Sequence, residues 1–89
     1  MVQYKSILEE DVEMWSSTIG AHCTVQKGCT LDNCIIYDHC TIGNGCVLKN
    51  CIIGQNVVIG DHCILDHCIL GNNVSINDNQ SFNYVTIHK

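Results

Sequence analysis

The sequence predicts an all-β fold, a parallel β-helix in which one chain winds around a triangular prism once in about 17 residues. Its eight cysteines stand five, six or twelve residues apart, and an aliphatic residue follows each of them two positions later. Extended in both directions, these aliphatic positions run from Val2 to Ile87 in repeating steps of six, six and five. All sixteen are apolar, whereas a composition that is 46% hydrophobic would fill about seven in a random frame. The cysteines are Cys23, Cys29, Cys34, Cys40, Cys46, Cys51, Cys63 and Cys68.

Each side of the prism is expected to be a three-residue strand such as Cys51 to Ile53, with the middle side chain outside and the other two inside. A helix would need apolar residues three and four apart, and this chain places its inward candidates two apart. Three sides close one turn, and about five turns spaced by about 4.8 Å make a prism roughly 25 Å long. We expect one domain over residues 1–89, with regular repeats over residues 17–78 and an irregular turn over residues 79–89.

Glycine and asparagine are predicted to form the corners between these sides. Glycine reaches left-handed backbone angles at little steric cost, and asparagine is the next most tolerant residue. The chain contains no proline, which suits strands whose N–H groups all bond to neighbouring turns. The predicted corner residues are Gly20, Gly28, Gly43, Gly45, Gly54, Gly60 and Gly71, together with Asn33, Asn44, Asn50 and Asn56.

Composition argues against two classes of partner. The net charge is −5 and only four residues are lysine or arginine, so no basic patch can neutralise the phosphates of a nucleic acid. No segment approaches the roughly 20 apolar residues of a membrane span, and no signal peptide opens the chain. We therefore expect neither nucleic acid nor a membrane as partner.

Eight cysteines in a short chain usually indicate a secreted disulfide framework. Here a column such as Cys34, Cys51 and Cys68 would keep neighbouring Cβ atoms about 4.8 Å apart, beyond the roughly 3.5 to 4.5 Å that a disulfide prefers. We expect reduced thiols that pack as small hydrophobic side chains, and hence a reducing compartment, the cytoplasm. Zinc is not expected, because no C-x2-C pair is present and the thiols of one turn are spread over three faces of a filled interior.

Histidines are the remaining candidates for a metal or catalytic site. His22 and His39 are one full period apart in the sequence, so they are expected to stack at one corner. His62 and His67 have the spacing of some metal pairs, but they fall on opposite sides of one strand and cannot share a metal within one chain. We interpret all four as solvated corner residues. Because the sequence shows no phosphate loop, paired carboxylates or activated nucleophile, we expect no catalytic residue, cofactor, metal or small-molecule substrate.

One predicted side has an apolar outer row. Its outward residues are Ile35, Ile52 and Ile69, flanked by Thr18 and Thr86. A contiguous exposed apolar row at strand spacing indicates a binding surface. β-branched residues also suit either face of a strand, so a purely structural interpretation of the row stays open.

The tract from Cys40 to Gly71, CTIGNGCVLKNCIIGQNVVIGDHCILDHCILG, resembles the hexapeptide-repeat β-helix family. The motif of that family is an aliphatic residue, often a glycine, two variable residues, a small residue and one more variable residue. Spacing alone does not show the hand of the coil, and right-handed crossovers are the general rule for parallel strands. The resemblance implies a single-stranded left-handed parallel β-helix.

Within that family the chain is similar to the C-terminal domain of the gamma and epsilon subunits of eukaryotic translation initiation factor 2B. The similarity lies in the short sides Asn33 to Ile36 and Asn50 to Ile53, and in the tail from Cys68 to Gly71 and from Asn83 to Ile87. It implies a non-catalytic assembly domain of a guanine-nucleotide exchange factor, which would bind other subunits of a complex through the isoleucine row. The sequence does not decide between gamma and epsilon.

A second function stays open. The chain also fits the C-terminal oligomerisation β-helix of a sugar-nucleotide pyrophosphorylase, such as a mannose-1-phosphate guanylyltransferase. A standalone binding protein similar to the β-helical antifreeze proteins fits less well, because those need ranks of outward Thr-x-Thr and no face of this chain has them.

Overall fold

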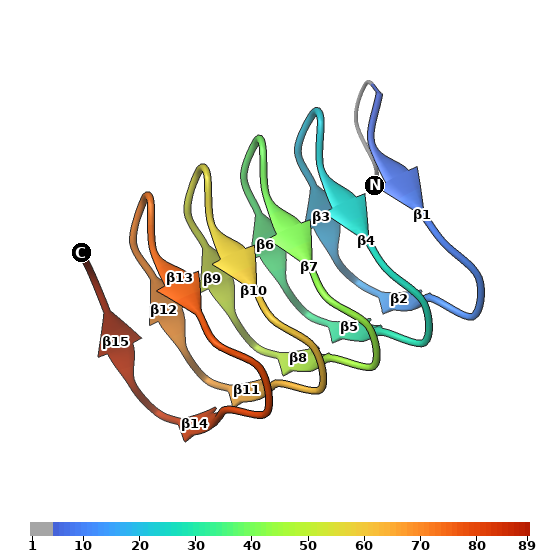
Figure 1. Cartoon of the computed structure of the whole chain (residues 1–89). Helices are drawn as coiled ribbons and strands as arrows, with labels where there is room; N and C mark the ends of the chain where they lie inside the picture. The colour runs from blue at the N-terminus through green and yellow to red at the C-terminus, as the bar shows by residue number, and fades with distance from the viewer. Residues whose placement is uncertain (1–4) are drawn as a thin grey trace.

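A computed structural model describes residues 5–89, and over this range the chain forms a β-helix (Figure 1). The fifteen strands of the described range build three parallel sheets of five strands each. In Figure 1 the chain runs down the front of the coil, back beneath it and up behind it as it advances toward the C-terminus, so the coil is left-handed. The inward position predicted at Val2 lies outside the described residues.

The three sheets are the three predicted sides of the prism, and strands one turn apart pair in parallel at the predicted register. The first sheet contains β3 (Thr18–Ile19), β6 (Ile35–Ile36), β9 (Ile52–Ile53), β12 (Ile69–Leu70) and β15 (Thr86–Ile87). The second contains β1 (Ile7–Leu8), β4 (Thr24–Val25), β7 (Thr41–Ile42), β10 (Val58–Ile59) and β13 (Ser75–Ile76). The third contains β2 (Glu13–Trp15), β5 (Thr30–Asp32), β8 (Val47–Lys49), β11 (Ile64–Asp66) and β14 (Ser81–Asn83).

Every corner of the described chain has one residue with a positive φ. Over most of the coil this residue stands directly before a small inward residue that opens the next side, whereas Asn79 precedes the exposed Gln80. Glycine takes this place only at Gly28 and Gly45, with φ of 73° and 66°. Asparagine and histidine fill nine of the other thirteen corners, because these residues tolerate left-handed angles better than most. The prediction of left-handed corners is thereby confirmed for Asn33, Asn50 and Asn56.

Asn44 and the other five glycines also lie in corners between successive strands, as predicted, but none of them has a positive φ. Most of these glycines are needed because a side chain from the next turn lies over them. A Cβ on Gly43 would lie 2.5 Å from Oδ1 of Asp61, which accepts a hydrogen bond from the backbone N–H of Asn44 at 2.9 Å. An acidic or amide side chain from the next turn covers the glycine in the same way at Gly20, Gly54 and Gly60.

The predicted inward frame is confirmed over the middle of the prism, where the aliphatic positions from Ile19 to Ile76 are buried. Strand β9 shows the alternation clearly, since Ile53 is fully buried while Ile52 is exposed. Toward the two ends the frame is less covered. Leu8 is exposed, and Met14, Phe82 and Ile87 are only partly buried against the core.

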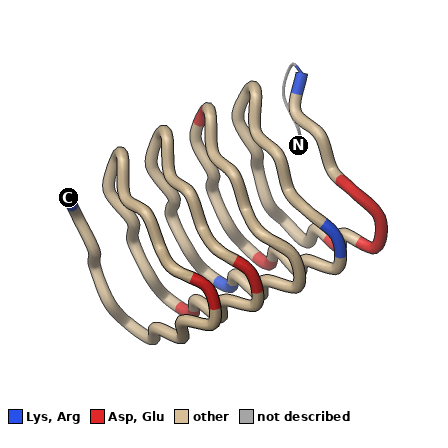
Figure 2. The backbone as a smooth tube through the Cα atoms, in the orientation of Figure 1, with Lys and Arg blue, Asp and Glu red and all other residues tan. Residues whose placement is uncertain are grey.

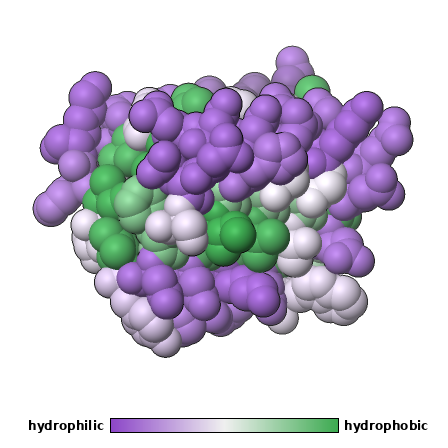
Figure 3. Space-filling view, turned by 60° about the horizontal axis from the view of Figure 1, so that its bottom comes forward, coloured by the Kyte–Doolittle hydropathy of each residue, from purple (hydrophilic) through white to green (hydrophobic). Residues whose placement is uncertain are grey.

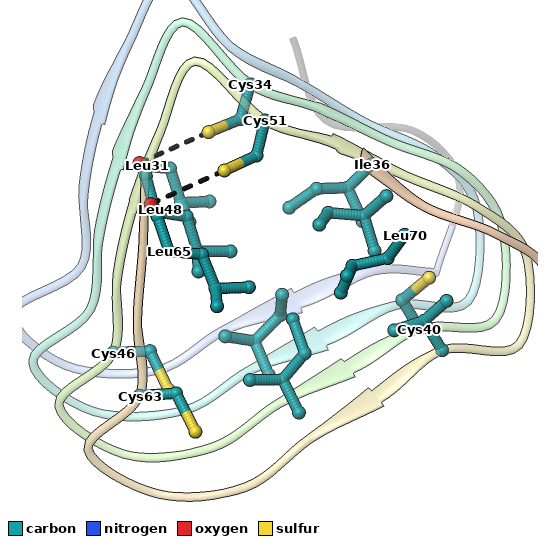
Figure 4. Packing of buried hydrophobic residues seen from close by; sticks show 14 of the residues in the cluster. Leu31, Cys34, Ile36, Cys40, Cys46, Leu48, Cys51, Cys63, Leu65 and Leu70 are labelled. Atoms are coloured by element: carbon teal, nitrogen blue, oxygen red, sulfur yellow. Dashed lines mark hydrogen bonds between the residues drawn. The ribbon is translucent and has the colours of Figure 1, made fainter. Parts of the chain in front are cut away.

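All eight cysteines are free thiols buried in this interior. Seven of them direct Sγ to the backbone carbonyl oxygen of the residue 14 positions later, in the next turn, at distances of 2.9 to 3.4 Å. Figure 4 shows two of these bonds, from Cys34 to Leu48 and from Cys51 to Leu65. Each thiol therefore serves both as a small apolar side chain and as a weak hydrogen-bond donor.

Burial raises the pKa of the Cys40 and Cys63 thiols. Removal from water raises the pKa of Cys40 to about 11. In the stacked pair of Cys29 and Cys46, the hydrogen bond between the thiols lowers the pKa of Cys29 to about 7 and raises that of Cys46. For the pair as a whole we expect the effect of burial to dominate. If one of the two thiols lost its proton, the thiolate would accept only one weak S–H hydrogen bond from the other thiol. It would also no longer donate its own hydrogen bond to a carbonyl oxygen.

Replacing Ile53 by lysine should unfold the domain, because the change buries an unpaired charge at a cost of several kcal/mol. Ile52→Lys is the matched control, since it adds the same charge to the outer face of the same strand and should leave folding intact. Thermal denaturation followed by circular dichroism measures both variants. If Ile53→Lys melts at the wild-type temperature, the inward frame is refuted.

Thiol titration should count eight free cysteines when the protein is denatured without reductant. The folded protein should react far more slowly with the same disulfide reagent, because its thiols are buried and donate hydrogen bonds to carbonyl oxygens. The reaction is followed by absorbance of the released chromophore. A count near zero after denaturation would instead support a secreted, disulfide-bonded protein.

Stability should fall as the pH rises above 9. The pKa of Cys40 is raised from 9.0 to about 11, so its protonated form stabilises the fold fully below pH 9, and this contribution is lost as the pH rises through about 11. Cys40→Val removes one such thiol, and Val57 and Val74 already stand in the same column. Urea denaturation across this pH range should show a smaller loss for the variant than for the wild type. An equal loss would contradict the assignment to Cys40.

Candidate interaction surface

The three predicted interface residues lie together on the outer face of the first sheet. Ile35 of β6, Ile52 of β9 and Ile69 of β12 are direct neighbours in the parallel register. Their exposed fractions are 44%, 41% and 46%. The sequence therefore placed these side chains on the outside, and their role in binding stays a prediction.

This outer face is depleted of charge. From Thr18 to Thr86, none of the residues that point outward from the five strands of the first sheet is acidic, lysine or arginine. Charged residues lie instead in or next to the corners of the coil and on its first turn (Figure 2). Depletion of charged residues is what distinguishes the centre of protein–protein interfaces from the rest of a protein surface.

A second row runs beside the isoleucines, where the strands of the first sheet end. Tyr37 is its largest member and is 50% exposed. At Gly54 the surface is covered by Asn72, whose Oδ1 would lie 2.5 Å from an added Cβ, whereas the nearest side chain to an added Cβ on Gly71 is His88, at 3.2 Å. The row therefore has an exposed ring at Tyr37 and, at Gly71, a glycine that no carboxylate or amide side chain covers. In order along the coil it contains Gly20, Tyr37, Gly54, Gly71 and His88.

Sequence reasoning missed this second row, because it used the glycines only as corner signals. The signal was available in the column of residues one turn apart, in which one tyrosine stands among glycines. A single column does not show that the tyrosine is exposed or that Gly71 lacks the carboxylate or amide side chain that covers Gly20 and Gly54. Both properties depend on which side chain comes from the next turn.

Apolar surface is not confined to the first sheet. Val58 of β10 and Ile64 of β11 are also exposed on the two other sheets. Figure 3, in which the lower side of Figure 1 turns forward, shows hydrophobic surface lying between two hydrophilic borders. The first sheet is distinguished by its three adjacent isoleucines, since the other sheets interrupt their outer rows with threonine or serine.

The four candidate histidines lie at corners, as predicted, and each has a positive φ. His22 and His39 stack with ring centroids 5.1 Å apart and nearly parallel planes, which confirms their predicted stacking. His62 and His67 are on opposite sides of β11, also as predicted. Among residues 5–89 no three histidine, cysteine, aspartate or glutamate side chains gather around a point where a metal ion could bind.

His67 contacts two neighbours. Its ring stacks on Tyr84 of the next turn at 4.5 Å, and its Nδ1 lies 2.6 Å from Oδ1 of Asp66. That oxygen is buried and has no other hydrogen-bond partner, so we infer that Nδ1 of His67 carries a proton and donates a hydrogen bond to Oδ1 of Asp66. The contact orders the last corners of the third sheet.

Within the described range, no helix is long and apolar enough to cross a membrane.

Comparison with solved structures finds the same fold in sugar acetyltransferases. One is a histidine-to-alanine mutant of GDP-perosamine N-acetyl transferase from Caulobacter crescentus, bound to CoA and GDP-perosamine, with 16% identity and a TM-score of 0.54. It covers 99% of this chain and 49% of its own. A histidine-to-asparagine mutant of the same enzyme has 17% identity and a TM-score of 0.54, and covers 92% and 49% of the two chains. At such identities the likeness shows the fold alone, and the chain spans about half the length of these structures.

Sequence comparison gives the family. No curated protein sequence matches the chain. The family model described as the EIF2B subunit epsilon LbH domain, where LbH denotes a left-handed β-helix, matches residues 1–84. That range includes almost all of the described coil, its strand register and the isoleucine row. The chain belongs to the family of EIF2B subunit epsilon LbH domains.

Proposed function

We propose that this domain is a non-catalytic assembly module of a translation initiation factor 2B-type guanine-nucleotide exchange factor. Its role is to bind other subunits of the complex through the outer face of the first sheet. The family match supports the type of complex. The observation that carries the binding role is the exposed row of Ile35, Ile52 and Ile69 on a face without acidic, lysine or arginine side chains.

The isoleucine row is a modest source of affinity by itself. More than half of each isoleucine surface is already covered by the domain. Burying the remainder contributes about 1 kcal/mol per residue, or about 3 kcal/mol for the row. A stable contact therefore needs more of the face, and the second row with Tyr37 provides the adjoining surface.

The acetyltransferase activity of the structural neighbours does not carry over to this chain. It belongs to proteins that share the fold at 16% and 17% identity and that are about twice as long. The assignment to an assembly role follows the family match and the surface instead.

Ile52→Lys should abolish binding to the gamma and epsilon subunits of translation initiation factor 2B while the domain stays folded. A lysine at this place puts a charge in the centre of the proposed contact, where desolvation is unfavourable. Ser75→Lys, on the exposed outer face of β13 in the second sheet, is the matched control and should bind as the wild type does. Isothermal titration against each purified subunit measures the affinities.

Two results would count against the proposal. Equal affinities of the wild type and Ile52→Lys would remove the first sheet as the interface. Failure of the wild type to bind either subunit would remove the assembly role in a factor 2B complex. The second result would favour the oligomerisation β-helix of a sugar-nucleotide pyrophosphorylase.

A further inference from the structure

We propose that the outer face of the first sheet also docks on the same face of a second copy of this chain, with the two coils antiparallel and Tyr37 of each copy packed on the partner's Gly71. The inference rests on the proposed function, because it uses the same isoleucine row. It adds the identity of one partner, a second copy of this domain.

The order of residue sizes in the second row is what points to a second copy. From the first turn to the fifth the row reads glycine, tyrosine, glycine, glycine, histidine. A two-fold axis parallel to the strands through the third turn exchanges the first turn with the fifth and the second with the fourth. Tyr37 then faces the partner's Gly71, and His88 faces the partner's Asp38, whose carboxylate lies over Gly20. The largest side chain of the row therefore meets a glycine, which makes this part of the face complementary to itself in shape, as a two-fold contact requires.

The isoleucine row fits the same arrangement. Ile52 lies on the axis and meets the partner's Ile52, while Ile35 meets the partner's Ile69. Two sheets that pack face to face lie about 10 Å apart, a space that pairs of isoleucines fill. Beside them a glycine leaves that space empty, and a tyrosine ring from the other copy is long enough to fill it. Tyr37 is exposed, and no carboxylate or amide side chain lies over Gly71, where the side chain nearest to an added Cβ is His88 at 3.2 Å.

Charge favours this orientation at the ends of the contact. The carboxylate of Asp38 lies over Gly20 and accepts a hydrogen bond from the N–H of Ala21 at 2.9 Å. The two-fold axis brings His88 and Lys89 of the other copy to this carboxylate. The same axis also brings Lys49 of β8 toward Lys49 of the other copy. Lys49 lies on the third sheet, beyond the corner, and is therefore outside the proposed contact.

The other possible two-fold axis, along the coil, gives a poorer fit. It pairs residues of the same turn across the isoleucine row, so that Tyr37 faces the partner's Asn33. No glycine stands at that corner of the described chain, where the column contains serine, asparagine, histidine and tyrosine. The antiparallel arrangement is therefore the one that the side chains support.

The contact is expected to be weak and reversible. The molecule measures 27 by 21 by 21 Å, so the face is no larger than 27 by 21 Å. Two such faces bury on the order of 1,000 Å² in total, which is the low end for specific protein–protein interfaces. Dimerisation should therefore be seen only at high protein concentration.

An exchange of tyrosine and glycine tests the proposal. Sedimentation velocity of the wild type from about 10 µM to about 1 mM should show a mass that rises toward the dimer. Tyr37→Gly leaves a gap and Gly71→Tyr opposes two tyrosines, so each should weaken the dimer at least about tenfold. The double variant puts a tyrosine opposite a glycine again and should recover most of the wild-type affinity. Circular dichroism checks that each variant is folded.

A monomeric wild type at every concentration, or a double variant no better than the single ones, would overturn the inference. If Gly71→Tyr does not fold, Ile52→Lys replaces it, because two lysines facing each other on the axis should leave only monomer. Binding to the factor 2B subunits is measured in parallel. If the wild type binds these subunits but stays monomeric by itself, this inference is wrong and the proposed function stands. If it forms the dimer but binds neither subunit, this inference stands and the proposed function is wrong.

Discussion

The whole coil depends on one backbone constraint, a left-handed residue at each corner. A residue of this kind stands at every corner of residues 5–89, and from Ser17 to Val74 the next side chain is buried in the interior. For an ordinary residue this conformation costs about 1 to 2 kcal/mol, which is why asparagine and histidine are favoured. The histidines that look like metal ligands in the sequence therefore have a backbone reason to stand where they do, as at His39 and His62.

Contacts between successive turns then fix the side chains. The carboxylate of Asp61 covers Gly43 and caps a backbone N–H of the turn before it. The thiol of Cys29 donates to the carbonyl oxygen of Gly43 in the turn after it, at 2.9 Å. Near the N-terminus a serine takes the small inward position, and the Oγ of Ser17 accepts a hydrogen bond from the N–H of Cys34. A small residue with a polar hydrogen fits this place, because the interior is apolar and the backbone beside it still needs partners.

The inward frame could be predicted from the sequence because burial imposes a strict period on apolar residues, and the same period put Ile52 outside and Ile53 inside. The reason for most of the glycines could not be predicted, since a glycine such as Gly43 is selected by a side chain that belongs to the following turn. The surface formed by Tyr37 and Gly71 was missed for a related reason: its meaning depends on which neighbours leave it uncovered and on symmetry between two molecules. Local propensity contains neither kind of information.

The regular stacking also determines how the molecule can change length. Each strand pairs only with the strands one turn before and one turn after it, so stability is the sum of many similar contacts between adjacent layers. Within residues 5–89 the outermost strands, such as β1 and β15, pair on one side only, and their core residues, such as Leu8 and Ile87, are incompletely covered. Such layers are expected to open first and to exchange their amide hydrogens fastest. For the same reason, a whole turn of the coil can be inserted or deleted during evolution while the packing of the remaining turns is kept.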